Sequence, residues 1–330
     1  MSKQIISPKK GKTTFLVKYF LLFLVFAVAI AFGLAEPRFF RSANLMEVMR
    51  SSVTLSIMAM GLCFVFAAGE IDFAAAYEMA VGAVIIGRLM DLPFFRNLYP
   101  LAIILTLLIM GCSGLINAFL VIKLNMPAFI ATLGMSTMLA GIAKYLTGGA
   151  TFISRRWPPI FTVIGQKFSF GFMPNPLWVL IFCGVLSYII LSKMRLGRHF
   201  YAVGGNREAA AHVGINVNRT KALAFMFCTM FVSAAGITAA STMRSVSPTM
   251  AAESMLGAIS ALMLGATFLR PGVFNIPGAI LGGVLLAVIQ NGLIMANASF
   301  WLKDIVQASI LLFSVGFISY LGAGLKVKMI

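Results

Sequence analysis

Long runs of apolar residues, rather than a regular alternation of apolar and polar positions, fill most of this chain of 330 residues. A helix that crosses the hydrocarbon core of a membrane needs about 20 mostly apolar residues, and such runs recur from one end of the chain to the other. Hydropathy and helix-breaking residues together predict ten spans. These are residues 15–35, 51–68, 73–90, 99–122, 127–146, 176–191, 222–240, 254–268, 277–296 and 303–321. The pattern therefore predicts an all-α fold, a polytopic membrane protein of about ten transmembrane helices that forms a single domain over residues 1–330.

The composition agrees with a membrane protein and excludes an ordinary water-soluble surface. Hydrophobic residues make up 60% of the chain and charged residues 11%, whereas soluble domains carry about 25% charged residues. The net charge of +17 does not indicate nucleic-acid binding, because the basic residues form no stripe with interleaved aromatic residues. The four cysteines stand singly in apolar runs without metal-ligand spacing, so the sequence predicts no metal and no cofactor.

The distribution of basic residues predicts the orientation in the membrane. Lysines and arginines gather in the N-terminal tail 1–14, in the loop at about 193–221 and in the last residues, 326–330. Because loops rich in Lys and Arg stay on the cytoplasmic side, both termini and this loop are expected in the cytoplasm. An even number of spans is consistent with that arrangement. The outside segments also carry some arginines, so the charges favour this orientation without fixing it.

Three of the nine acidic residues (Glu70, Asp72 and Glu78) fall within nine positions, in the stretch FAAGEIDFAAAYE. A charge at the centre of a membrane helix costs about 2.5–3.5 kcal/mol on insertion scales, so such a residue usually faces a cavity or a partner. Gly69 marks a break between two spans, expected either in a cytoplasmic turn or in an unwound segment partly within the membrane. Asp72 either caps the following helix or lines a cavity. Glu78, one turn further on, is expected to have a buried functional or structural partner.

The loop between the sixth and seventh predicted spans contains a short helix signal. Asn206 is a favourable N-cap residue, Glu208 and an alanine run follow it, and Gly214 is a favourable C-cap residue. The sequence therefore predicts a short helix over 206–212. A short amphipathic helix on the cytoplasmic face is suited to docking with a partner protein.

Two enzyme-like motifs have simpler interpretations. The segment KKGKTT ends like a phosphate-binding loop but lacks the first glycine and the preceding strand, so the chain is expected to bind no nucleotide itself. The segment GCSG at 111–114 resembles the nucleophile motif of intramembrane serine proteases, but a serine nucleophile needs a base within hydrogen-bond reach. The only histidines, His199 and His212, lie in the loop. Small residues that let helices approach closely explain GCSG better.

Several segments, in order along the chain, resemble one known family. They are GEID at 69–72, GLINAFLV at 114–121, PAFIATLGMSTMLAGIAKYLTGG at 127–149 and GRHFYAVGGNREAAAHVGINVNRTKALAF at 197–225. Together they make the chain similar to the permease subunits of bacterial ABC importers for ribose, xylose and related sugars. The resemblance implies a subunit that is not itself an enzyme and that lies as a multi-pass protein in the bacterial inner (plasma) membrane. Two such permeases, identical or homologous, would form a translocation pore within the membrane lipid. A cytoplasmic ABC ATPase would drive the pore and a periplasmic sugar-binding protein would deliver the solute.

The same resemblance assigns candidate residues to two sites. The loop helix would be the coupling helix seated on the ATPase, with Gly205, Asn206, Glu208, Ala209, Ala210 and Gly214 as its residues. Candidates for the substrate path are Glu70, Asp72, Glu78, Phe129 and Thr132.

Two departures from the family pattern limit how much of the family's function can be inferred for this chain. After Asp72 the family usually continues Leu-Ser-Val-Gly, whereas this chain reads FAAAYEMAVG. Near the eighth span, LGATFLRPGVFNIPG stands where the family usually has two pairs of glycines. The solute carried is therefore not implied by the resemblance.

The leading hypothesis is an ATP-driven importer permease for a monosaccharide or similar polyhydroxylated solute. The alternative is an ion-coupled secondary transporter that uses Glu70, Asp72 or Glu78 to relay protons or bind Na⁺. The loop helix discriminates between them, because only an ABC permease needs a dock for an ATPase. An intramembrane enzyme is disfavoured for want of an embedded base or metal cluster.

Overall fold

The computed structural model describes residues 12–154, 157–250 and 254–325; parts of the basic tails, 1–11 and 326–330, lie outside the described residues. The described chain is mostly helical. Its elements are α1 Lys12–Ala35, the 3₁₀ turn η1 Pro37–Phe40, α2 Ser42–Ala67, α3 Ala75–Asp91, α4 Pro93–Asn97, α5 Tyr99–Ile122, α6 Ala128–Thr147, α7 Pro159–Gln166, β1 Phe168–Ser169, β2 Met173–Pro174, α8 Pro176–Tyr188, the π-turn η2 Ile189–Lys193, α9 Arg195–Gly205, α10 Arg207–His212, α11 Val217–Met243, α12 Ser254–Gly265, α13 Ile276–Met295 and α14 Phe300–Leu325. The two strands form one short antiparallel hairpin.

Seven helices of the described chain are long and apolar enough to cross a membrane. They are α1, α2, α5, α6, α8 with η2, α11 and α13. Two of the other predicted spans correspond to shorter helices, α3 with 17 residues and α12 with 12, and α14 has 26 residues. The predicted all-α membrane fold is therefore confirmed, while the count of ten spans stays a prediction.

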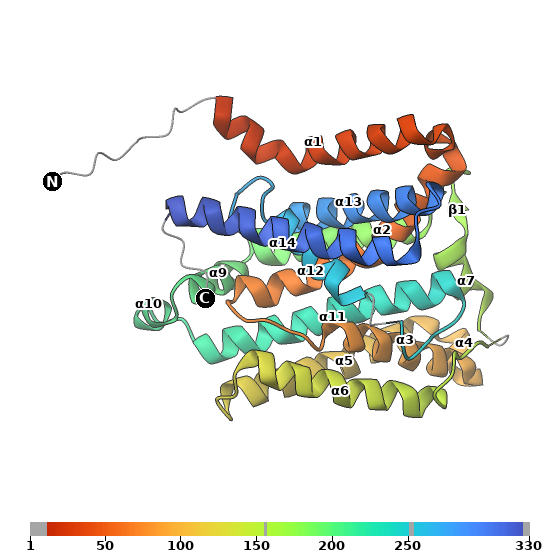
Figure 1. Cartoon of the computed structure of the whole chain (residues 1–330). Coiled ribbons are helices and arrows are strands. Elements are labelled where there is room, and N and C mark those ends of the chain that lie inside the picture. Colours follow the sequence, from red (N-terminus) through yellow and green to blue (C-terminus); the bar gives the residue numbers. More distant parts are fainter. Residues whose placement is uncertain (1–11, 155–156, 251–253, 326–330) are drawn as a thin grey trace.

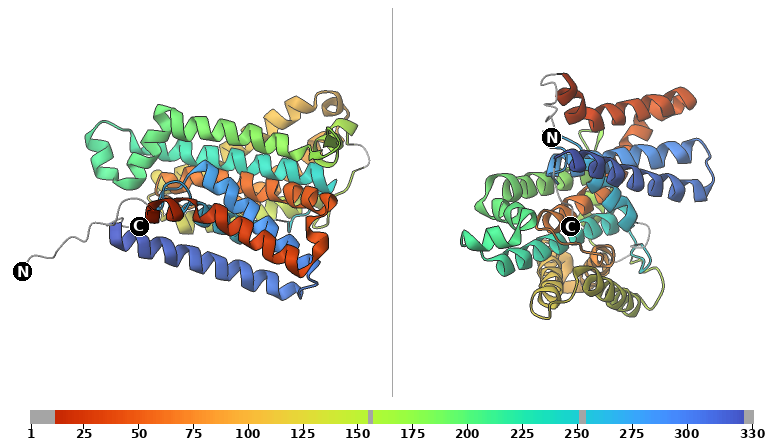
Figure 2. Two further views of the ribbon diagram at one scale, coloured as in Figure 1. Left: turned by 90° about the horizontal axis from the view of Figure 1, so that it is seen from above. Right: turned by 60° about the vertical axis from the view of Figure 1, so that its left-hand side comes forward.

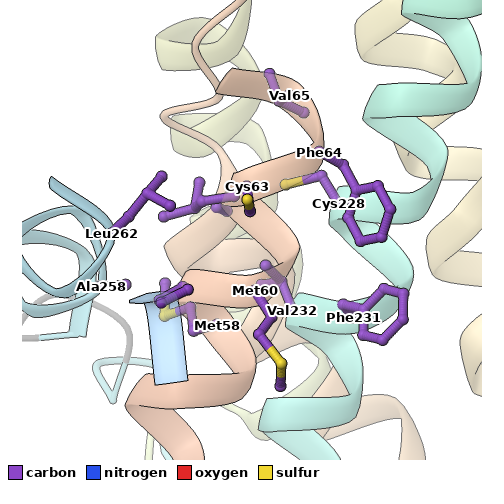
Figure 3. Close-up of a cluster of buried hydrophobic side chains, with 14 of the residues drawn as sticks. Met58, Met60, Cys63, Phe64, Val65, Cys228, Phe231, Val232, Ala258 and Leu262 are labelled. Carbon is purple, nitrogen blue, oxygen red and sulfur yellow. The ribbon is translucent and has the colours of Figure 1, made fainter. Parts of the chain in front are cut away.

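Helices α2 and α11 form the centre of the bundle, and α3, α5, α12 and α13 pack around them (Figure 1). The right-hand view in Figure 2 shows α1 at the edge of the bundle. Helix α1 packs against α13. Figure 3 shows the central core, in which side chains of α2, α11 and α12 meet. The ring of Phe64 on α2 stacks on that of Phe231 on α11, with 5.3 Å between the ring centroids. The two central helices thus share one apolar interface, and the other helices of the bundle pack around this pair.

Small residues let the central helices approach one another closely. A Cβ atom added at Gly236 of α11 would overlap the carbonyl oxygen of Met79 on α3. At Gly61 of α2, an added Cβ would lie 2.9 Å from the carbonyl oxygen of Cys228. Such contacts are the usual means of association between helices in lipid, where burial of apolar surface supplies little driving force.

The segments that the sequence singles out lie together at one end of the bundle. Helix α2 ends there, α9 and α10 lie there, and α11 starts there, at the left of Figure 1. Helix α1 begins and α14 ends at this same end. We call it the α10 end.

Candidate functional site

The break at the end of α2 is built by a left-handed glycine. Gly69 has φ +73°, a conformation that favours glycine because it has no Cβ atom. The N–H of Glu70 then donates to the carbonyl of Val65 at 3.0 Å, which closes the last turn of α2. Residues 68–74 carry the chain from α2 to α3 without helix, so the predicted break is present. We call residues 69–73 the break segment.

Glu70 points from the break segment to the loop that contains α10. Its Oε1 lies 2.7 Å from Arg207 Nη2 and 2.7 Å from Lys221 Nζ. The side chain of Glu70 is 8% exposed and that of Lys221 is 11% exposed, so both charges are largely withdrawn from water. Arg207 also donates to the carbonyl of Gly69 at 3.2 Å. One carboxylate therefore joins the break to the first residue of α10 and to the first turns of α11.

Helix α9 touches the same break through its backbone. A Cβ atom at Gly204 would overlap the carbonyl oxygen of Ala67 and lie 2.9 Å from the backbone nitrogen of Gly69. At the neighbouring Gly205, nothing lies within 4 Å of an added Cβ. The phenol of Tyr201 on α9 donates to the carbonyl of Phe274 at 2.5 Å, and burial raises the pKa of that phenol. Helix α9 is thereby held to the bundle from two sides.

Helix α6 holds the other side of the break segment. The backbone N–H of Phe73 donates to Thr132 Oγ1 at 3.1 Å, and that hydroxyl donates to the carbonyl of Ala128 at 2.7 Å. The rings of Phe73 and Phe129 meet edge to face, with 5.4 Å between their centroids. Thr132 is buried whereas Phe129 is 53% exposed. Of these two path candidates, Thr132 contacts the break by a hydrogen bond and Phe129 by its ring.

Asp72 lies at the start of α3. Its Oδ1 accepts a hydrogen bond from the N–H of Ala74 at 2.9 Å, a contact typical of a carboxylate at a helix N-terminus. The N-cap of α3 is Ala74, which has no side-chain cap hydrogen bond, so Asp72 supports the turn that precedes the helix rather than capping the helix itself. The residue is fully buried, however, and its Oδ2 has no hydrogen-bond partner among the described residues.

Glu78 is fully buried on α3, and its polar partner is Asn117 of α5. The Asn117 amide Nδ2 donates to Glu78 Oε1 at 2.9 Å. Asn117 also lies beside Asp72, so the two acids share this neighbour. Within the described part of the chain, Glu78 Oε2 and Asn117 Oδ1 are buried without a hydrogen-bond partner. We call Asp72, Glu78 and Asn117 the buried polar cluster.

The short helix predicted in the loop is confirmed as α10. Asn206 caps it by accepting a hydrogen bond from the N–H of Ala209 at 2.9 Å. Gly214 ends it with φ +82°. Glu208 and Ala209 are exposed, whereas Ala210 faces the bundle and is 3% exposed. A shallow depression with a volume of about 280 Å³, lined by residues 203–208, lies where α9 meets α10.

The structure adds functional candidates that the sequence does not single out. Arg207 and Lys221 bind Glu70 from positions more than 130 residues away. Gly204, rather than Gly205, is the glycine packed against the break. Asn117 stands inside GLINAFLV, so its polar side chain in an apolar run was an available signal. Gly114 of GCSG packs against Thr229 and Phe225 of α11, which agrees with the close-packing interpretation of that motif.

Comparisons with known proteins assign the class. A profile described as "Branched-chain amino acid transport system / permease component" matches residues 44–315. The ribose import permease RbsC of Haemophilus influenzae is 30% identical over 304 residues, which cover 91% of this chain and 92% of that protein. RbsC of Escherichia coli K12 is 29% identical over 96% of this chain and 98% of its own length. The L-arabinose transport system permease AraH of the same strain is 30% identical over 91% and 90%. No solved structure matches the chain significantly.

The long apolar helices and the matching permease profile together identify a polytopic membrane permease. The chain belongs to the branched-chain amino acid transport system permease component family. The predicted resemblance to sugar permeases of ABC importers is confirmed by the ribose and arabinose relatives. The predicted location, a multi-pass protein of the bacterial inner (plasma) membrane, is confirmed with it.

Proposed function

We propose that this chain is the transmembrane permease subunit of an ATP-driven ABC importer for a monosaccharide or similar polyhydroxylated solute. The observation that carries the ATP-driven part is α10, a short helix exposed at one end of the bundle and joined by Glu70 to the bundle interior. Such a helix offers a docking surface to a cytoplasmic ATPase. The ion pair between Glu70 and Arg207 connects that surface to the bundle interior. ATP hydrolysis belongs to that separate subunit.

The α10 end is the cytoplasmic end in this proposal. The loop around α10 holds six Lys or Arg residues over 193–221, as expected of a cytoplasmic connection. The common placement of the start of α1 and the end of α14 at this end supports cytoplasmic termini. A periplasmic sugar-binding protein then docks at the opposite end, and a second copy or a homologue completes the pore within the lipid.

The substrate path is proposed to pass the break segment and the start of α6. Phe129 offers an exposed aromatic ring there, while Thr132 and Asp72 hold the break in place. Glu78 is fully buried on α3, and its side chain supports the wall of this path. Glu70 is turned toward the coupling loop, so its contribution to the path is through the position of the break.

A second candidate function is an ion-coupled secondary transporter. The buried polar cluster favours it, because carboxyl oxygens without partners inside a membrane protein suit a proton or Na⁺. Such a carrier works without an ATPase, and this requirement separates the two candidates.

Reversing the charge of Glu208 is expected to weaken binding of the ATPase. Glu208→Lys places a positive charge on the exposed face of α10, and a reversed charge in an interface should cost about ten-fold or more in affinity. The measurement is the amount of ATPase subunit that copurifies with the permease from membranes. Glu47→Lys is the matched control, because it makes the same change on an exposed side chain of α2 outside the α10 end. Equal retention of the ATPase by both variants would contradict the role of α10.

A further inference from the structure

Glu70 contacts residues of both α10 and α11, so it connects the loop at the α10 end to the interior of the bundle. Helix α10 makes few contacts with the rest of the bundle besides its neighbours α9 and α11. Glu70 supplies a direct connection, because one buried oxygen binds Arg207 at the start of α10 and Lys221 in α11 at 2.7 Å each. We call these three residues the Glu70 clamp.

The segment attached to the clamp is fastened at several points to helices of the bundle. It follows the last turn of α2 and precedes α3. The N–H of Phe73 donates to Thr132 of α6, and Gly204 of α9 lies on the backbone of Ala67. A displacement of α10 therefore acts on α2, α3 and α6 through one short segment that is not helical. Such a junction can change its backbone angles without breaking a helix.

We propose that Glu70 is a positioning residue that transmits movement of α10 to the break between α2 and α3. This proposal rests on the proposed function, in which the ATPase moves α10. The clamp has one anion and two cations, so loss of Arg207 or of Lys221 leaves the other ion pair in place. Loss of the Glu70 charge removes both ion pairs at once and leaves Arg207 with its hydrogen bond to the carbonyl of Gly69.

The test compares ATP hydrolysed per sugar molecule imported by the reconstituted transporter, with its ATPase and binding protein. Glu70→Gln keeps the shape of the side chain and removes its charge. It is expected to retain the ATPase and continued hydrolysis while uptake falls by about ten-fold. Arg207→Gln and Lys221→Gln should each have a smaller effect, and Arg207→Gln should add little to Glu70→Gln. Arg219→Gln, which removes an exposed positive charge from the same loop, should leave the ratio unchanged.

A merely structural role would lower hydrolysis and uptake together, so an unchanged ratio in Glu70→Gln overturns the proposal. Full additivity of Glu70→Gln and Arg207→Gln overturns it as well. Hydrogen exchange of the permease alone gives a readout that needs no ATPase. Exchange over residues 207–215 should quicken in Glu70→Gln and not in Arg219→Gln, and equal exchange in both variants counts against the clamp. Wild-type protein that binds no ATPase would contradict the proposed function instead.

The buried polar cluster carries a second, independent proposal. Asp72 Oδ2, Glu78 Oε2 and Asn117 Oδ1 are all acceptors, all buried, and all without a donor among the described residues. The titratable groups that face Glu78 are Asp72 from the break segment, the Cys228 thiol of α11 and, beyond it, the Cys63 thiol of α2. Asn117 and Thr229 are uncharged. No lysine or arginine of the described chain forms an ion pair with either acid, so among these residues the cluster has no positive charge to balance its carboxylates.

The structure assigns to this cluster a bound proton, held on Glu78. Asp72 has a backbone donor and lies at the N-terminus of α3, where a negative charge is favoured. Glu78 has only neutral donors beside it, the amide of Asn117 and the hydroxyl of Thr229, and a charge without a cationic partner in such surroundings is costly. A proton on Glu78 neutralises that residue and adds a donor beside the unpaired acceptor oxygens of Asp72 and Asn117. The proton comes from water, and no other bond changes.

Infrared spectroscopy of the purified permease tests the assignment directly. Wild-type protein at neutral pH should show the carbonyl band of a protonated carboxylic acid, and Glu78→Gln should lose it. Glu47→Gln, which neutralises an exposed carboxylate, should keep the band. Absence of the band from the wild type, or its persistence in Glu78→Gln, overturns the proposal. Stabilisation of the wild type by Na⁺ that is absent in Glu78→Gln would assign a metal cation in place of the proton.

Discussion

Alanine at two adjacent glycines of α9 is expected to change the stability of the permease in opposite directions. Gly204→Ala should destabilise the protein, because the new methyl group would overlap the carbonyl oxygen of Ala67. Overpacking of this kind typically costs about 1–3 kcal/mol. Gly205→Ala meets open space at the last residue of α9, and alanine favours a helix over glycine by at most about 0.5–1 kcal/mol.

The measurement is the thermal unfolding midpoint of both variants in the same detergent. Gly204→Ala should also lower sugar uptake, because α9 would no longer seat on the end of α2. A lower midpoint for Gly205→Ala than for Gly204→Ala would show that α9 does not pack on the break as described. Equal midpoints for the two variants would have the same meaning.

Leucine at Gly114 is expected to prevent assembly of the bundle. A Cβ atom at this position would lie 2.5 Å from Thr229 Oγ1 and 2.6 Å from the carbonyl oxygen of Phe225. A leucine side chain would push α5 away from α11, and overpacking on this scale should cost about 3 kcal/mol or more. Because Asn117 lies one turn further along α5, its hydrogen bond to Glu78 should be lost as well.

Gly134→Leu is the matched control. Gly134 is exposed on α6, and nothing lies within 4 Å of an added Cβ, so leucine there should meet no overlap within the chain. The yield of monodisperse protein after membrane extraction distinguishes the two variants. Normal yield and unfolding of Gly114→Leu would contradict the close contact between α5 and α11.

Local signals in the sequence predicted several elements at the right place. The cap at Asn206 and the left-handed Gly214 bracket α10, and both act within a few residues of the helix that they delimit. Gly69 similarly marks the break. The α9 helix was not predicted, because it contains three glycines, which disfavour helix when it is not supported by packing.

Contacts between segments far apart in the chain could not be predicted from the sequence. Glu70 was a candidate for the substrate path, and nothing near it in the chain indicates partners at Arg207 and Lys221. Helix lengths were also misjudged at α2, which begins nine residues before the predicted span. Glu47 and Arg50 make that first part look polar. They lie near the opposite end of α2, where Glu47 is half-exposed and pairs with Arg50.

Membership of the family does not indicate a role for Glu78. The relatives are named for ribose and L-arabinose, yet Glu78 stands in FAAAYEMAVG, a stretch that departs from the pattern expected of the family. The cluster that includes Glu78 lies directly behind the proposed path. The solute of this permease is therefore best identified from the ligand held by its own binding protein.

Uptake into vesicles tests the central claim most directly. The permease is reconstituted with its ATPase and its binding protein, and labelled sugar is measured with and without ATP in the ATPase-facing compartment. We predict uptake that requires ATP and the ATPase subunit and that survives collapse of the proton and sodium gradients. Uptake by the permease alone, driven by an ion gradient and abolished when that gradient is collapsed, would contradict the account.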